Sequence, residues 1–149
     1  MNGLNPQDVE MLMRLSVATL CGGLIGLERE IHRKVAGLRT HALVSLGSAL
    51  IMLVSVDMFA AYRGIATVDP SRIAAQVVSG IGFLGAGAII RFPTGITGLT
   101  TAASLWVVSA IGLASGAGFF KPVLVTTVLV LVVLIFFARV GRFFGWKDV

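Results

Sequence analysis

The chain has 149 residues, of which 56% are hydrophobic and only 13% are charged. Soluble globular domains carry about 25% charged residues, so this composition excludes the soluble class and predicts a protein embedded in a lipid bilayer. The single cysteine excludes an intrachain disulfide framework. The net charge of +5 does not indicate nucleic-acid binding, because the basic residues flank apolar segments, where they orient membrane proteins and contact anionic lipid.

Five apolar segments are long enough to cross about 30 Å of hydrocarbon, which takes about 20 helical residues. They cover residues 9–27, 41–62, 72–91, 97–117 and 121–139. We therefore expect an all-α membrane protein, a compact bundle of about five transmembrane helices that forms a single domain over residues 1–149.

The distribution of basic residues predicts the orientation. If the first loop is cytoplasmic, eight cations lie inside: Arg29, Arg33, Lys34, Arg39, Arg91, Arg139, Arg142 and Lys147. Four lie outside: Arg14, Arg63, Arg72 and Lys121. Cytoplasmic loops carry the excess of Lys and Arg, so we expect the N-terminus outside and the C-terminus inside.

Small residues in the first span predict close helix packing. Gly22 and Gly26 are four residues apart, and Gly23 lies on a face shared with hydroxyl side chains. Arg14 and Glu28 lie near opposite ends of this span and cannot pair with each other.

The loop after the first span is the densest polar region. Its cations fit an anchor on the cytoplasmic leaflet. Alternatively, Glu28 and Glu30, interleaved with Arg29, Arg33 and Arg39, form a salt-bridged gate or a docking surface. The two histidines, His32 and His41, lack the companions of a zinc site, and we expect both at the membrane interface.

In the second span, Asp57 lies about one turn inside the outer boundary, where a carboxylate must be paired or hydrated. Arg14 and Arg72 should lie at the same level, so we expect an ion pair between Asp57 and one of them. The alternative is an entry site for a cation or a proton. A separate face of this span carries His41, Ser45, Ser48, Met52 and Ser55.

The third span contains Gly80, Gly82, Gly85 and Gly87 together with one amide, Gln76. Small residues on nearly every face predict a central helix with close neighbours all round. The amide must find a partner in hydrocarbon, either a neighbouring helix or a substrate. A continuous helix is favoured over one broken at the glycines to bind an ion.

The fourth span carries hydroxyls that bond either to their own helix or to a neighbour: Thr100, Thr101 and Ser104 lie near its start. The fifth is almost purely aliphatic and aromatic and is expected to face lipid. The chain shows no catalytic triad, paired catalytic carboxylates, phosphate-binding loop or metal-ligand cluster. It therefore indicates a non-enzymatic protein without a cofactor.

Three segments carry a more specific pattern: 22–30 continuing into 36–44, 69–87 and 98–106, with the run RIAAQVVSGIGFLGAG at 72–87 the most distinctive. Together they resemble the MgtC/SapB family of bacterial inner-membrane proteins over residues 10–118. The polar positions that match the family are Glu28, Arg29, Arg39, Thr40, Arg72, Gln76, Thr100 and Thr101. MgtC-like members carry a soluble domain after the last span, whereas about ten residues follow it here, as in a short, SapB-like member or in a chain cut to the membrane domain.

The resemblance implies a link to growth in low magnesium and to virulence, and two activities remain open. The first is binding to other membrane proteins, such as the proton-translocating ATP synthase, or to further copies of itself. The second is transport of a cation such as Mg²⁺, to which a homo-oligomer would contribute a ring of Asp57 or Glu28 carboxylates. Both place the chain in the bilayer of the bacterial inner membrane as a multi-pass protein.

Overall fold

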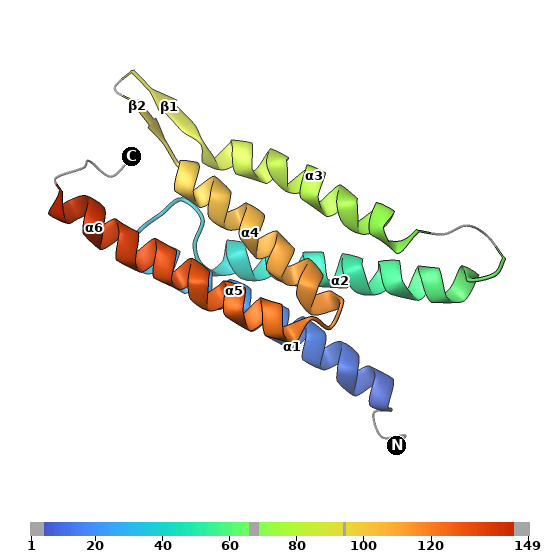
Figure 1. Cartoon of the computed structure of the whole chain (residues 1–149). Helices are drawn as coiled ribbons and strands as arrows, with labels where there is room; N and C mark the ends of the chain where they lie inside the picture. The colour runs from blue at the N-terminus through green and yellow to red at the C-terminus, as the bar shows by residue number, and fades with distance from the viewer. Residues whose placement is uncertain (1–4, 66–68, 94, 145–149) are drawn as a thin grey trace.

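The computed structural model describes residues 5–65, 69–93 and 95–144. Helices run up and down the bundle, and one short hairpin joins two of them (Figure 1). In chain order the elements are α1 (Pro6–Ile31), α2 (Leu38–Tyr62), α3 (Pro70–Ala88), β1 (Ile90–Phe92), β2 (Gly95–Thr97), α4 (Leu99–Gly116), α5 (Phe120–Val132), a π-helical stretch (Val133–Phe137) and α6 (Ala138–Phe143). The last three form one continuous rod (Figure 1).

Four helical stretches of the described chain are long and apolar enough to cross a membrane: α1, α2, α4 and Phe120–Gly141. The chain is therefore a multi-pass membrane protein, as its composition predicts. The 19 residues of α3 match the length of a span, but this helix is not among the four candidate spans of the described chain. A fifth span and the outward N-terminus stay predictions.

Capping residues define where α1 and α3 begin. Asn5 caps α1, because its side chain accepts a hydrogen bond of 2.8 Å from the backbone N–H of Asp8. Asp69 caps α3 in the same way, accepting from the N–H of Ser71 at 2.8 Å, and Pro70 follows at the first helical position. Hydrogen bonds from the Ser71 hydroxyl and N–H lower the pKa of the Asp69 carboxyl.

The core lies where α1, α2 and α4 contact one another. Glycines make this contact close: a methyl group added to Gly22 would lie 2.6 Å from Cβ of Ser45. On α4, a methyl group added to Gly112 would lie 2.2 Å from the carbonyl oxygen of Ser45. These distances are too short for any side chain, so the backbones of α1 and α4 approach α2 as closely as glycine allows.

The helix α3 lies on the outside of this core, against α4 and α2 (Figure 1). A methyl group added to Gly80, Gly82 or Gly87 would have no neighbour within 4 Å, whereas one on Gly85 would lie 3.6 Å from Cβ of Ala102. The expectation that the third helix is central is therefore wrong. Small residues permit close packing on any face, but only the stripe with Ile81, Gly85 and Ala88 is buried.

The expected all-α fold also needs a correction after α3. That helix ends at Ala88, and the chain then forms an antiparallel hairpin in which Arg91 pairs with Ile96. Gly98 returns the chain into α4 with a φ of 90°, and a methyl group there would lie 1.9 Å from the carbonyl oxygen of Ala88. Only glycine fits both constraints.

Candidate functional site

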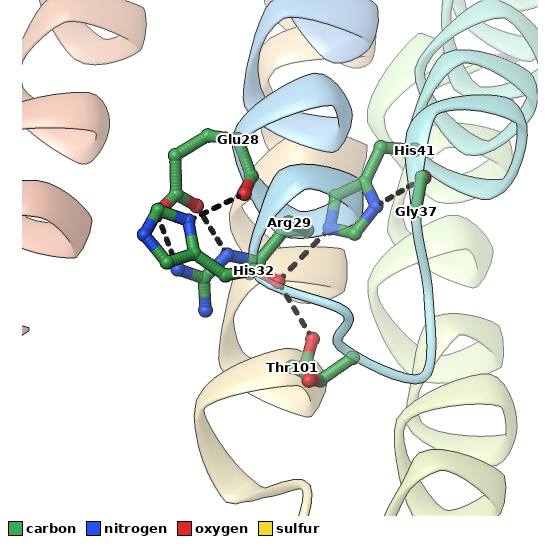
Figure 2. Close-up of polar contacts among 7 residues, drawn as sticks. Glu28, Arg29, His32, Gly37, His41 and Thr101 are labelled. Carbon is green, nitrogen blue, oxygen red and sulfur yellow. Dashed lines mark hydrogen bonds and ion pairs between the residues drawn. The ribbon is translucent and has the colours of Figure 1, made fainter. Parts of the chain in front are cut away.

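Polar side chains, buried except for the exposed His32, meet where the C-terminal end of α1 lies beside the N-terminal ends of α2 and α4 (Figure 2). We call this group the polar cluster; it consists of Glu28, Arg29, His32, His41, Thr101 and Ser104. Arg29 is 3% exposed and His41 is fully buried. Charged residues are almost never buried this deeply unless they are paired.

Arg29 is paired with the residue that precedes it. Its Nη2 donates to Oε1 of Glu28 at 2.7 Å, and its Nε donates to Oε2 of the same carboxylate. Nδ1 of His32 lies 3.1 Å from the same Oε1. A bidentate pair of this kind offsets the free-energy cost of removing both charges from water. Either charge buried alone would strongly destabilise the fold.

His41 connects α2 to α4. Its Nδ1 lies 2.9 Å from the carbonyl oxygen of Gly37, and its Nε2 lies 2.9 Å from Oγ of Ser104. A carbonyl only accepts, so Nδ1 carries the hydrogen, and in the neutral ring Nε2 accepts from the Ser104 hydroxyl. The Ser104 hydroxyl also lies 2.8 Å from the carbonyl oxygen of Thr101. Its single hydrogen is therefore shared between two acceptors, this carbonyl oxygen and Nε2 of His41.

The contacts within the polar cluster are those of a structural hydrogen-bond network rather than those of a metal centre. Its groups bond to one another, and no group of three His, Cys, Asp or Glu side chains positioned to hold a metal occurs among the described residues. The expectation of an interfacial His41 is wrong. Its burial was signalled by the serines that share its face, since Ser45, Ser48 and Ser55 are buried as well.

At the opposite end of the bundle, Arg14 makes different contacts from those expected. It pairs with Glu10 one turn away, and its Nη1 donates to the carbonyl oxygen of Gly116 at 2.7 Å. Asp57 is exposed and makes no ion pair with any described residue, so the expected pair with Arg14 or Arg72 is wrong. Glu10 outcompetes Asp57 because it lies on the same helix, four residues from the guanidinium.

Asp57 and Arg14 nevertheless line one cavity of about 450 Å³. Asp8 and Glu10 contribute two further carboxylates to its wall. The cavity lies near the N-terminal end of α1, and its wall carries three carboxylates and one guanidinium.

An apolar groove runs between α2 and α3, with a volume of about 620 Å³. We call it the α2–α3 groove. It is lined by Leu43, Val44, Gly47, Ser48, Ile51, Ile73, Gln76, Val77, Gly80, Ile81 and Leu84. Gln76 is exposed within this groove, so the expectation of a buried amide bonded to a neighbouring helix is wrong. Its only neighbour that carries a polar side chain in this lining is Ser48.

The remaining predicted residues are spread over the surface. Arg39 and Thr40 line a polar pocket beside the α1–α2 loop, Thr100 is exposed at the start of α4, and Arg72 is exposed on α3. Gly23 faces the Leu38 side chain, with 3.5 Å to an added methyl group. The predicted site residues therefore do not form one site: four belong to the polar cluster and the others lie elsewhere.

Comparison with known proteins identifies relatives of this chain. A model described as the MgtC family matches residues 15–143. The chain is 49% identical over 127 residues to a protein of Escherichia coli (strain K12) named "Putative magnesium transporter YhiD", covering 84% of this chain and 59% of that one. It is 40% identical over 142 residues to protein SapB of Bacillus subtilis, covering 93% and 61%.

Protein MgtC of Salmonella typhimurium is 46% identical over 120 residues, which cover 80% of this chain and 49% of that one. The chain thus spans about half to three fifths of the length of the curated relatives it matches. No solved structure matches it.

Proposed function

Because the chain belongs to the MgtC family, we propose that it is a non-enzymatic protein of the bacterial inner membrane that acts by binding other membrane proteins. In this proposal it supports growth when magnesium is limiting and contributes to virulence, as the family resemblance implies. The observation that carries the proposal is the α2–α3 groove, which leaves Gln76 and Gly80 open to the bilayer.

Two properties of the groove favour a protein helix as its occupant. Helices associate in lipid through close packing and hydrogen bonds, and glycine at position 80 lets a second backbone approach. The Gln76 amide is exposed in the groove. In hydrocarbon an unpaired amide is costly, so a partner helix that hydrogen-bonds to it there would gain stability. An amphipathic or small-residue helix lying in a groove is an established recognition mode, and a second copy of the chain is one such partner.

Site-specific photo-crosslinking in native membranes tests this proposal. A photoreactive residue replaces Gln76 in the groove, and in a control it replaces Leu129, which is 57% exposed on α5. We expect one discrete protein adduct from position 76 and only lipid adducts from position 129. The Gly80→Leu substitution, which fills the groove, should abolish the adduct, and Gly82→Leu, outside its lining, should preserve it. Identical adducts from both positions would refute groove binding.

Cation transport is the second candidate, and two observations favour it. One relative is named as a putative magnesium transporter, and three carboxylates, those of Asp8, Glu10 and Asp57, line one cavity. Against it, Arg14 lies in the same wall, and Glu28, the one buried acid among the described residues, is held by Arg29. Mg²⁺ uptake into liposomes that contain the purified chain, lost in Asp57→Asn, would support transport.

A further inference from the structure

Two cavities of opposite character meet beside the α1–α2 loop. The first, the basic pocket, has a volume of about 310 Å³ and is lined by Glu30, Arg33, Lys34, Val35, Gly37, Arg39 and Thr40. The second, the apolar pocket, has a volume of about 430 Å³ and is lined by Val35, Ala36, Thr40, Phe83, Leu84, Ala86, Gly87, Ala88 and Leu105. Val35 and Thr40 line both, so the two cavities are adjacent.

The basic pocket carries an excess of positive charge that the chain does not neutralise. Arg33, Lys34 and Arg39 are exposed, and none of them makes an ion pair with a residue that the structure describes. Glu30 is the one acid in the wall, and its Oε2 already accepts a hydrogen bond of 2.7 Å from the backbone N–H of Leu38. Three cations therefore face a cavity whose single carboxylate caps a helix, which favours an anionic ligand.

Arg33, which lines the basic pocket, has a strained backbone conformation. Arg33 has a left-handed φ of 52°, a conformation that glycine normally supplies at the end of a helix. Its N–H donates to the carbonyl of Glu30 at 2.9 Å, and the N–H of Lys34 donates to that of Arg29 at 3.0 Å, which closes α1 in a Schellman motif. Glycine would adopt this conformation without strain, whereas arginine is strained there. In exchange, the arginine places a guanidinium group at the pocket.

The apolar pocket has the character of an acyl-chain site. It runs between the loop, the C-terminal turns of α3 and the start of α4, and its wall is almost entirely hydrocarbon. Gly87 leaves it open, because a methyl group there would meet nothing within 4 Å. Phe83, 84% exposed, extends its rim toward the bilayer.

We propose that these adjoining pockets bind one anionic phospholipid, with its phosphate against Arg33, Lys34 and Arg39 and the start of an acyl chain in the apolar pocket. A soluble phosphate would use the basic half alone, whereas a neutral lipid would use only the apolar half. The basic pocket and the apolar pocket lie side by side at the junction between two spanning helices, where lipid headgroups lie. This combination selects an anionic lipid. This binding site goes beyond the proposed function and does not depend on a partner in the α2–α3 groove.

Native mass spectrometry of the purified full chain, titrated with phosphatidylglycerol or phosphatidylcholine of matched chains, tests the proposal. We expect phosphatidylglycerol to bind at least tenfold more tightly. Arg33→Gly combined with Arg39→Gln should weaken it about 25-fold, since each basic side chain near an anionic surface contributes about fivefold. Glycine suits the left-handed position, so the fold is preserved; Lys34→Gln, at an exposed site, provides an independent variant with about a fivefold loss.

A matched control removes two cations from the opposite end of the bundle. Arg63→Gln combined with Arg72→Gln should leave phosphatidylglycerol binding unchanged. Gly87→Leu should weaken it by filling the apolar pocket. Equal affinity for both lipids, or unchanged binding in the Arg33/Arg39 and Lys34 variants, would overturn the proposal. Displacement of the lipid by equimolar glycerol 3-phosphate or inorganic phosphate would also overturn it, in favour of a soluble anion.

Discussion

At the scale of single residues, the polar cluster explains why charges sit inside a protein so poor in them. Glu28 and Arg29 satisfy each other, and His41 reaches both a loop carbonyl and the Ser104 hydroxyl. His41 thereby joins α2 to α4, whereas Glu28 and Arg29 neutralise each other within α1. Each of these groups becomes costly if its partner is removed.

Replacing Arg29 by Met should strongly destabilise the fold, because the carboxylate of Glu28 would stay buried without its counter-charge. Losses of this kind are about 3–5 kcal/mol in the free energy of unfolding. Titration with a denaturing detergent, followed by circular dichroism, measures the change. Arg63→Met at an exposed position is the control and should stay within about 0.5 kcal/mol of wild type. Equal stability of the two variants would show that the pair is not structural.

Ser104→Ala should leave the imidazole of His41 with an unsatisfied nitrogen in the core. We expect a loss of about 1–3 kcal/mol in the free energy of unfolding. Thr100→Ala, an exposed hydroxyl on the same helix, should change it by less than about 0.5 kcal/mol. The same detergent titration compares them, and a larger effect from Thr100→Ala would contradict the hydrogen-bond assignment.

At the scale of helices, glycine has two different roles in this chain. Gly22, Gly112 and Gly116 let α1 and α4 touch the backbone of α2, whereas Gly80 and Gly82 on α3 face open space. The first role belongs to the fold of the single chain. Of the two open glycines, we assign association in the bilayer to Gly80, which lines the α2–α3 groove.

Substituting alanine at these glycines should therefore give changes of opposite sign. Gly112→Ala forces a methyl group against the Ser45 carbonyl, and overpacking of this kind costs about 1–3 kcal/mol. Gly82→Ala has room for its methyl group and raises helix propensity, which should stabilise α3 by about 0.5–1 kcal/mol. Thermal unfolding in detergent measures both. Destabilisation by Gly82→Ala in the monomer would show that α3 packs more closely than the structure indicates.

The difference between the two glycine groups also shows what sequence could predict. Helix positions followed from hydropathy and caps, because both are local properties: α2 was expected at 41–62 and is Leu38–Tyr62. Which glycine face meets a neighbour depends on tertiary contacts, so the close approach at Gly112 was missed and α3 was wrongly placed at the centre. By contrast, the pairing of Arg14 with Glu10 follows from their four-residue spacing on α1, a local signal that the sequence already carries.

At the scale of the whole molecule, the α1–α2 loop, the hairpin and α6 lie at one end of the bundle (Figure 1). The polar cluster and the basic pocket are at this end as well, because both include residues that border the loop. The excess of cations predicts that this end faces the cytoplasm, where anionic lipid gives the leaflet a negative surface potential.

Cysteine accessibility tests that orientation. In a Cys21→Ser background, single cysteines at positions 34 and 121 mark the two ends of the bundle. We expect an impermeant thiol reagent added to intact cells, with the outer membrane permeabilised, to label position 121 and not position 34. The reverse pattern would place the basic pocket in the outer leaflet.

Growth under magnesium limitation tests the central claim, that the α2–α3 groove rather than a cation path carries the function. A bacterial host that lacks its own MgtC-family gene would express the wild type, Gly80→Leu or Asp57→Asn at matched membrane levels. We predict that the wild type and Asp57→Asn restore growth and that Gly80→Leu does not, because leucine occupies the groove. Growth with Gly80→Leu together with failure of Asp57→Asn would contradict the account and favour transport.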